Sequence, residues 1–310
     1  MRALRTPHAP PSGESLPSLL AGVVSGAAAR EFPAMLSVWA AQAAGQLTSL
    51  TWDAGACWLG LYLSAKIIDD VQDGEAGLFP AHIPSPMRIN LALALLFSGQ
   101  LCLAGQPQCP DSRERLALLA VTIAHSLEIT QGQQFGLQPW HEGREPLGWA
   151  WWHAGEKGGR PLALACRLGA MSVAAASPVV DGLACYGQCV GEAVQAIDDA
   201  MDLVELRAND LVHGQSSLAV AYAFDVADQA DRSDLTMLLD GIREGVAGAL
   251  SATRDKLLAM GAARYLSVEA TARVLRARGI LEELNDALQP EGKALLWRAT
   301  ELLLPASAGG

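Results

Sequence analysis

The stretch Ser64-Ala-Lys-Ile-Ile-Asp-Asp-Val-Gln-Asp73 decides how this chain is interpreted, because it leads an apolar segment into three acids with the pattern D-D-x-x-D. The same pattern returns in Gln195-Ala-Ile-Asp-Asp-Ala-Met-Asp202. On a helix, residues i and i+4 share a face one turn apart, so each run projects two carboxylates from one face and a third beside them. Like charges at that spacing destabilise a helix by about 0.2–0.5 kcal/mol per pair. A bound cation would remove this repulsion.

The acids of the two runs are therefore candidate metal ligands, namely Asp69, Asp70, Asp73, Asp198, Asp199 and Asp202. Mg²⁺ takes carboxylate oxygens and shares its coordination shell with phosphates. Two such runs predict two helices that face each other across a pocket, with a polyanion held between them by metal. A single run of this kind is usually a solvated acidic face. Two copies, each following an apolar helical pattern, favour the metal–diphosphate interpretation.

The composition of the 310-residue chain indicates a large helical protein. Hydrophobic residues make up 51% of it and charged residues 18%, against a usual charged fraction of about 25%. The net charge of −11 argues against a nucleic-acid partner bound through phosphates. The longest apolar stretches, Ile89 to Ala104 and Leu162 to Val180, are interrupted by polar residues. Because a spanning helix needs about 20 largely apolar residues, we expect no integral membrane span.

Helical periodicity continues through nearly the whole chain, and we expect one domain. Residues 1–14 predict a disordered N-terminal arm, residues 15–305 a single all-α domain, and Ala306 to Gly310 a frayed tail. The helices expected before and through the acidic runs include Trp52 to Gln72 and Asp181 to Glu205. Towards the C-terminus, Ser233 to Met260 predicts one long helix. No β-alternation extends beyond about four residues.

The six cysteines lack C-x-x-C spacing, and no His/Cys cluster suggests zinc. The Pro-rich, polar start of the chain lacks the apolar core of a signal peptide. We therefore expect a cytoplasmic protein with reduced thiols.

Five blocks of the sequence, in order, resemble motifs of the trans-isoprenyl (polyprenyl) diphosphate synthase family, across about residues 22 to 225. The two acidic runs are similar to the first and second aspartate-rich motifs. The other blocks are Gly26–Pro33, which resembles G-G-K-R-x-R-P, Gly132–Leu137, which resembles G-Q-x-x-D-L, and Glu156–Gly159, which resembles K-T-[GA]. A further stretch, Asp210–Leu218, resembles D-x-x-x-G-K-x-T-L.

The resemblance implies a fold and a reaction. The fold is the isoprenoid synthase (class I terpenoid synthase) helical bundle around a central cavity, usually as a homodimer. The reaction is the ionisation of an allylic isoprenyl diphosphate, with three Mg²⁺ ions held by the two runs, and release of pyrophosphate. A dry apolar cavity protects the carbocation from water. By the same resemblance, Lys157 and Arg30 would bind diphosphate oxygens, and Gln133 and Gln195 would line the pocket.

Departures from the family pattern concern the second substrate. The family binds isopentenyl diphosphate with basic residues, but Ala29 and Phe32 occupy two of those positions here, and no arginine pair follows Asp73. Each missing charge-assisted hydrogen bond would have contributed about 1.5–3 kcal/mol. Unless another residue such as Arg88 substitutes, we expect ordinary chain elongation to be impaired. In the third block, Gly136 stands in place of the family's aspartate.

Several outcomes for the carbocation stay open. We expect cyclisation, as in a terpene synthase, or transfer of the prenyl group, with chain elongation on isopentenyl diphosphate as the alternative. The short interval from Asp202 to Asp210 resembles a branch that prenylates a peptide pheromone at tryptophan, which points to a non-diphosphate acceptor. A non-catalytic regulatory subunit is less favoured, because such subunits usually lose their aspartates. A prenyl diphosphate-binding protein is the remaining interpretation.

Smaller signals are interpreted as structural. We expect Lys66 to point away from Asp69 and to be solvated or ion-paired, and His153 to be a surface or network residue. The tryptophans that precede Lys157 are more often packing residues than stabilisers of a cation; they are Trp140, Trp149, Trp151 and Trp152.

Overall fold

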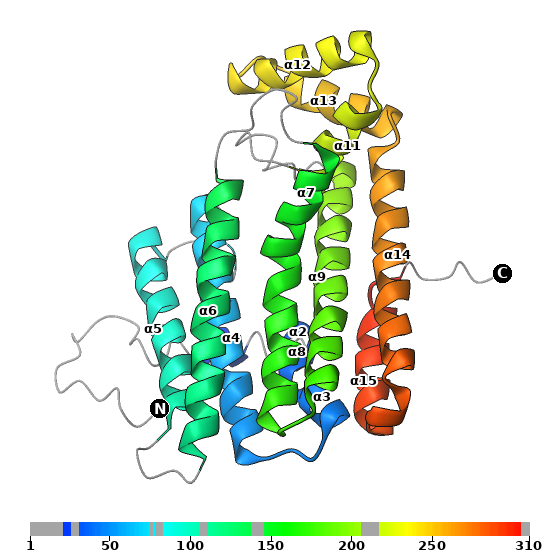
Figure 1. The fold of residues 1–310 in the computed structure, drawn as a ribbon. Helices are drawn as coiled ribbons and strands as arrows, with labels where there is room; N and C mark the ends of the chain where they lie inside the picture. The colour runs from blue at the N-terminus through cyan, green and yellow to red at the C-terminus, as the bar shows by residue number, and fades with distance from the viewer. Residues whose placement is uncertain are drawn as a thin grey trace. The chain divides into compact units, whose positions relative to one another are not determined.

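The computed structural model describes residues 21–25, 31–74, 77, 83–105, 111–137, 146–205 and 217–304. In this part of the chain the regular elements are helices, so the expected all-α fold is confirmed (Figure 1). Their bounds are α2 Glu31–Ala34, α3 Leu36–Ala44, α4 Ser49–Gln72, α5 Ser85–Ala104, α6 Ser112–Gly136, α7 Leu147–Ala154, the π-helical turn η1 Gly155–Gly159, α8 Arg160–Ser172, α9 Ser177–Glu205, α11 Leu218–Val226, α12 Gln229–Arg243, α13 Ala249–Ala259, α14 Ala262–Glu283, the 3₁₀ turn η2 Asn285–Ala287 and α15 Pro290–Glu301.

The chain divides into two compact units, and the single-domain expectation stays a prediction. Unit 1 comprises Met1–Ala124, Leu164–Val180 and Ala287–Leu296. Unit 2 comprises His125–Ala163, Asp181–Asp286 and Trp297–Gly310. The first acidic run thus belongs to unit 1 and the second to unit 2.

In unit 1, α4 carries the first acidic run and packs against α5 (Figure 1). The helix begins at a capping box, in which the Thr48 side chain accepts a hydrogen bond from the Thr51 backbone and the Thr51 side chain accepts one from the Thr48 backbone. Glycines allow the two helices to approach closely: a Cβ on Gly60 would lie 2.7 Å from the carbonyl oxygen of Leu95. The adjoining core contains Leu63, Ile67 and Leu91.

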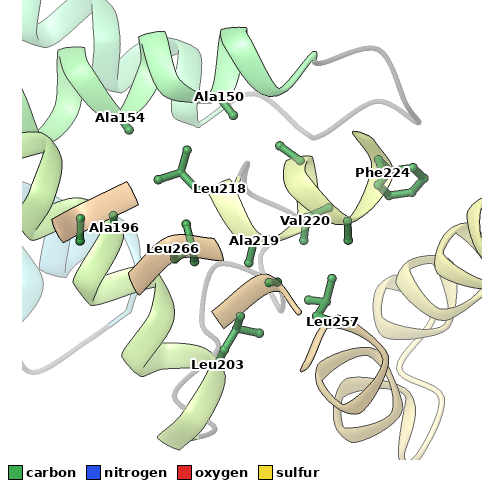
Figure 2. Packing of buried hydrophobic residues seen from close by; sticks show 14 of the residues in the cluster. Ala150, Ala154, Ala196, Leu203, Leu218, Ala219, Val220, Phe224, Leu257 and Leu266 are labelled. Carbon is green, nitrogen blue, oxygen red and sulfur yellow. The ribbon is translucent and has the colours of Figure 1, made fainter. Parts of the chain in front are cut away.

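In unit 2, a core of small and branched apolar side chains surrounds the end of α9 and the start of α11 (Figure 2). Leu203 of α9, Leu218 of α11 and Leu266 of α14 are buried in it. Across the end of α9 lie α12 and α13, where the Arg254 guanidinium donates to the carbonyl of Leu203 at 2.7 Å (Figure 1). The helix that carries the second acidic run is therefore anchored at its C-terminal end.

The long helix expected over Ser233 to Met260 is wrong, because the chain breaks between α12 and α13. Gly245 and Gly248 adopt positive φ angles of 70° and 84°. Residues with side chains rarely adopt this conformation, so two glycines three positions apart allow the chain to leave one helix and begin the next. The two glycines are visible in the sequence, but the apolar periodicity on either side of them favours a continuous helix.

Among the described helices, α5 has the length and apolar character of a membrane span. About a third of its most apolar window, 33%, is buried inside the protein. The apolar stretch of the sequence starts at Ile89, whereas the helix begins at Ser85 with Pro86 in its first turn. Proline fits there because the first helical N–H groups have no intrahelical acceptor.

Candidate active site

The first acidic run lies at the C-terminal end of α4, where its three acids differ in burial. Asp69 and Asp73 are half-buried, and the N–H of Asp73 donates to the carbonyl of Asp69 at 2.9 Å. These two residues are therefore one helical turn apart on one face. Asp70 is only 2% exposed. The run consequently presents a pair of accessible carboxylates and encloses the third.

Asp70 is enclosed by a turn and neutralised by a lysine. Gly77, with a φ of 57°, lies directly against its carboxylate, and a Cβ at position 77 would overlap that group. The Lys66 ammonium lies 2.7 Å from Asp70 Oδ1 and 3.8 Å from Asp69 Oδ2. Neither oxygen of Asp70 accepts a hydrogen bond of good geometry from the described residues, so the contact with Lys66 is an ion pair. The expectation that Lys66 points away from Asp69 is wrong, whereas its ion-paired state is confirmed.

The second acidic run lies near the end of α9 and follows the same division. Asp198 is exposed and Asp202 half-buried, whereas Asp199 is buried. Both oxygens of Asp199 are engaged: Oδ1 accepts from the Gln195 amide at 2.7 Å, and Oδ2 accepts from the backbone N–H of Leu218 at 2.9 Å. Leu218 is the first residue of α11, whose leading N–H groups lack partners within the helix. Asp199 thus ties α11 to α9.

Lys157 lies in the π-helical turn η1 between α7 and α8, and it is half-buried. The turn crosses α9 at glycines, where a Cβ on Gly158 would lie 2.8 Å from the carbonyl oxygen of Gly191 and 3.1 Å from Cβ of Gln195. A side chain on Gly191 would overlap the backbone of Gly158. This close crossing brings the Lys157 block beside the second acidic run. Single π-helical turns occur frequently at functional sites.

A chain of polar contacts connects the same η1 turn through α9 to α14. The Gln188 amide donates to the carbonyl of Gly155 at 3.1 Å and to Glu192 at 3.0 Å. Glu192 in turn accepts from Arg273 of α14 at 3.0 Å. The Arg273 guanidinium stacks 3.3 Å from the ring centroid of Trp151. Trp151 is therefore a packing residue, as the sequence suggested.

The end of α6 packs against the same region through Gly132 and Gly136. A Cβ on Gly132 would lie 2.7 Å from Cβ of Glu156, and one on Gly136 would lie 2.6 Å from Nε2 of His153. His153 is 7% exposed, so its expected place at the surface is wrong. Its ring stacks on Trp149 with centroids 5.5 Å apart. The imidazole thus occupies the space that the missing side chain at position 136 leaves.

Burial lowers the pKa of His153, and the nearby charge of Lys157 lowers it further, so the ring is neutral at pH 7. The backbone carbonyl of Gly132 and the charge of Glu156 act in the opposite direction. Nε2 has no hydrogen-bond partner among the described residues. Glu156 itself is committed to Arg160, which donates to both of its carboxylate oxygens at 2.6 Å and to Glu128 at 2.6 Å. The salt bridge raises the pKa of Arg160, and the guanidinium stays charged.

The structure thus brings together three of the sequence blocks in unit 2. The block that ends at Gly136 contacts the block of Lys157, and the latter contacts Gln195 of the second acidic run. Gln133 is half-buried near the end of α6. The first run belongs to unit 1, and Arg30 lies outside the described residues. The assignment of these residues to metal or diphosphate stays a prediction.

Arg88, which the sequence raised as a substitute for the missing basic residues, is buried in unit 1. Its Nε donates to the carbonyl of Ile83 at 2.7 Å. This contact holds the segment before α5 to the first turns of the helix.

The donors available to a metal are hard oxygens, which fits Mg²⁺. Asp69 with Asp73, and Asp198 with Asp202, each provide two carboxylates one turn apart. Mg²⁺ usually takes one or two carboxylates and completes its shell with water and substrate phosphates. Over the described residues, no group of three or more His, Cys, Asp or Glu side chains is placed to hold a metal by itself. Each of the two pairs described above has only two carboxylates, which agrees with the absence of a group of three among the described residues.

Solved structures with the same fold are polyprenyl and geranylgeranyl diphosphate synthases. One is the polyprenyl synthase of Caulobacter crescentus complexed with calcium and isoprenyl diphosphate, with a TM-score of 0.80, 18% identity, and coverage of 96% of this chain and 91% of that one. Another is the geranylgeranyl pyrophosphate synthase of Lactobacillus brevis, with a TM-score of 0.79, 17% identity, and coverage of 94% and 91%. A third is the geranylgeranyl pyrophosphate synthetase of Pyrococcus horikoshii, with a TM-score of 0.76, 18% identity, and coverage of 95% and 92%.

These similarities establish the fold over nearly the entire chain and confirm the isoprenoid synthase bundle expected from the sequence motifs. At the level of sequence, no family model and no curated protein matches the chain.

Proposed function

We propose that this protein is a Mg²⁺-dependent enzyme that ionises an allylic isoprenyl diphosphate and releases pyrophosphate. The observation that carries the proposal is the shared pattern of the two acidic runs. In each run, the aspartates at the first and fifth positions of the pattern are the less buried ones, and the aspartate at the second position is enclosed. The fold, shared with polyprenyl synthases, one of which binds calcium and isoprenyl diphosphate, supports the same conclusion.

Each residue has a defined part in the proposed reaction. Of the six aspartates that the sequence predicts as metal ligands, the more accessible Asp69 and Asp73 in unit 1, and Asp198 and Asp202 in unit 2, would each bind Mg²⁺ as a pair. Bound Mg²⁺ would stabilise the negative charge that develops on the leaving pyrophosphate. Lys157 would donate to diphosphate oxygens, because its block crosses α9 beside the second run. Gln195 would act mainly through Asp199, to which it donates. Arg30 and Gln133 stay proposed substrate contacts.

The fate of the carbocation separates two candidate functions. The sequence put cyclisation or transfer to another acceptor first. The structures with this fold are named as synthases of polyprenyl and geranylgeranyl diphosphates, so the comparisons favour the alternative, chain elongation on isopentenyl diphosphate. Cyclisation or transfer remains the second candidate, because no arginine pair follows Asp73 and because Arg88 is buried against Ile83.

The decisive experiment measures pyrophosphate release with Mg²⁺ and C10, C15 or C20 allylic diphosphate, each with and without isopentenyl diphosphate. Elongation predicts release only with isopentenyl diphosphate and a longer diphosphate by mass spectrometry. Release without it, giving a hydrocarbon or alcohol, identifies the second candidate. No release under any condition, despite Mg²⁺-dependent substrate binding, would identify a binding protein.

A matched pair of variants on α9 tests the metal site within the same experiment. Asp198→Asn alters a proposed ligand, whereas Asp181→Asn alters an exposed aspartate on the same helix. We expect release to collapse only in the first variant. Equal activity in both would exclude Asp198 from the reaction.

We also propose that the protein is a homodimer that uses the outer face of α5. Ile89, Leu93, Phe97 and Leu101 follow one another at four-residue spacing and are all exposed, the last two at 60%. Rows of exposed apolar side chains that lack charges are typical of interface cores. The variant Phe97→Glu should convert a dimer to a monomer in analytical ultracentrifugation. A wild-type monomer that binds lipid vesicles would instead assign this face to a membrane.

A further inference from the structure

Lys66 is a cation in the middle of a site otherwise built from acids. Its ammonium lies 2.7 Å from Asp70 Oδ1 and 3.8 Å from Asp69 Oδ2. Asp70 is almost completely buried and accepts no hydrogen bond of good geometry from the described residues. Lys66 therefore compensates the charge of Asp70, and it reaches one of the proposed metal ligands as well.

In the second run, the buried acid accepts hydrogen bonds from neutral groups. Asp199 is stabilised by the Gln195 amide and the Leu218 backbone N–H, which are neutral donors. These donors stabilise the carboxylate without cancelling its charge. In the first run, Lys66 adds one positive charge beside the acids. The buried acids of the two runs thus have different contacts: Asp70 pairs with a cation, and Asp199 accepts from neutral donors.

Lys66 is also able to move. Its side chain is 45% exposed, whereas that of Asp70 is 3% exposed. A lysine with a flexible stem and a half-exposed head can turn towards solvent at little cost, because water solvates the ammonium. The buried carboxylate has no such freedom.

We propose that Lys66 is a resident counter-ion of the first acidic run, which lowers the affinity of that run for divalent cations in the absence of substrate. This inference rests on the proposed function, because it assumes that Asp69 and Asp73 hold metal. Lys66 is a positioning residue: it acts through Asp70 and Asp69, and it is distinct from the groups that would contact the diphosphate.

The test is calorimetric titration of the full-length protein with Mg²⁺ alone, without substrate. Removing one positive charge beside the carboxylates should tighten Mg²⁺ binding about tenfold in Lys66→Gln, because opposite charges at contact distance interact strongly in a partly buried site. The double variant Lys66→Gln/Asp70→Asn removes one charge of each sign, so its affinity should return to within about threefold of the wild type.

Lys256→Gln is the matched control. Lys256 also bridges two aspartates, at 2.6 Å from Asp231 and 3.3 Å from Asp234, but it lies far along the chain from either run. Its removal should leave Mg²⁺ affinity unchanged. The thermal midpoint should fall in Lys66→Gln without Mg²⁺ and recover when Mg²⁺ is added.

Unchanged or weaker Mg²⁺ binding in Lys66→Gln overturns the proposal. If that variant does not fold, the double variant decides: affinity close to wild type supports the proposal, and lost or tenfold tighter binding overturns it. A wild-type protein that releases no pyrophosphate contradicts the proposed function. If the wild type releases pyrophosphate but Lys66→Gln has unchanged Mg²⁺ affinity, only the proposed role of Lys66 is contradicted, and the proposed function stands.

Discussion

The two acidic runs share the pattern D-D-x-x-D and differ in how the structure satisfies the buried second acid. Asp70 pairs with a half-exposed lysine from the previous turn of its own helix. Asp199 accepts hydrogen bonds from Gln195, one turn earlier, and from Leu218, at the start of another helix. The first arrangement is local and exchangeable, and the second connects two elements. Two runs with the same sequence pattern can therefore bind the same kind of ligand and still contribute differently to the free energy of unfolding.

The largest expected effect is a loss of pyrophosphate release, and it should be the same for both acidic runs. Asp69→Asn and Asp198→Asn each remove charge from an accessible first aspartate. Pyrophosphate release should fall by about 10²–10³-fold or more in both, because stabilisation of the leaving group's charge supplies several kcal/mol. Steady-state assays at saturating Mg²⁺ measure this effect. The unfolding free energy should change little, since neither residue is fully buried. A variant that retains full activity would show that only one run holds metal.

A second prediction separates the runs by stability. Asp199→Ala leaves the Leu218 N–H and the Gln195 amide without their acceptor, and hydrogen bonds to charged groups contribute about 1.5–3 kcal/mol each. We expect Asp199→Ala to lower the unfolding free energy by about 3 kcal/mol. Asp70→Ala should cost about 1 kcal/mol or less, because its partner is half-exposed and can be solvated. Urea denaturation compares the two variants directly, and equal losses would contradict the comparison.

The sequence predicted the runs but not this difference. Periodicity and spacing were enough to place both runs on helices and to name the fold, because they depend on neighbouring residues. The burial of Asp199 depends on its contact with Leu218, which lies 19 residues later in the chain. Composition and periodicity do not predict a contact between residues so far apart. The burial of Asp70 depends on the turn at Gly77. The i and i+4 spacing separates two acids of each run from the third, but only the structure shows that the third acids, Asp70 and Asp199, are buried.

The surroundings of Lys157 show a similar limit. The sequence identified Lys157 by resemblance, yet gave no reason for glycine at Gly158 and Gly159. The structure supplies one, because the π-helical turn and Gly191 of α9 approach so closely that a side chain would overlap the backbone. A signal was present in the three glycines, but only spatial pairing makes it interpretable.

Helix crossings provide the third prediction. Each run-bearing helix packs against a neighbour through glycines: α9 at Gly191 and α4 opposite Gly99. A Cβ on Gly191 would overlap the carbonyl of Gly158, whereas one on Gly99 would lie 3.0 Å from the carbonyl oxygen of Cys57. Overpacking costs about 1–3 kcal/mol. We therefore expect Gly191→Ala to be destabilised by about 2 kcal/mol, and Gly99→Ala by less, in thermal or urea unfolding.

The kinetic consequence of the same pair sharpens the comparison. Gly191→Ala should also raise KM for the allylic diphosphate, because Lys157 moves with the η1 turn. Gly99→Ala should leave KM unchanged. A normal KM in folded Gly191→Ala would show that Lys157 does not depend on the crossing for its place.

The smallest effect concerns pH and the buried histidine near the second run. Burial and then the charge of Lys157 hold the pKa of His153 below its usual 6.5, so the folded protein binds fewer protons there than the unfolded chain does.

The stability that this group contributes is therefore complete above pH 6.5 and is lost as the pH falls below that value, with a limiting slope of about 1.4 kcal/mol per pH unit. Between pH 7 and 5.5 we expect the free energy of unfolding to fall, measured by urea unfolding at each pH. His153→Gln should remove this component, whereas His125→Gln, which alters the histidine beside Glu128, should retain it. A slope that survives in His153→Gln would show that the pH sensitivity arises elsewhere.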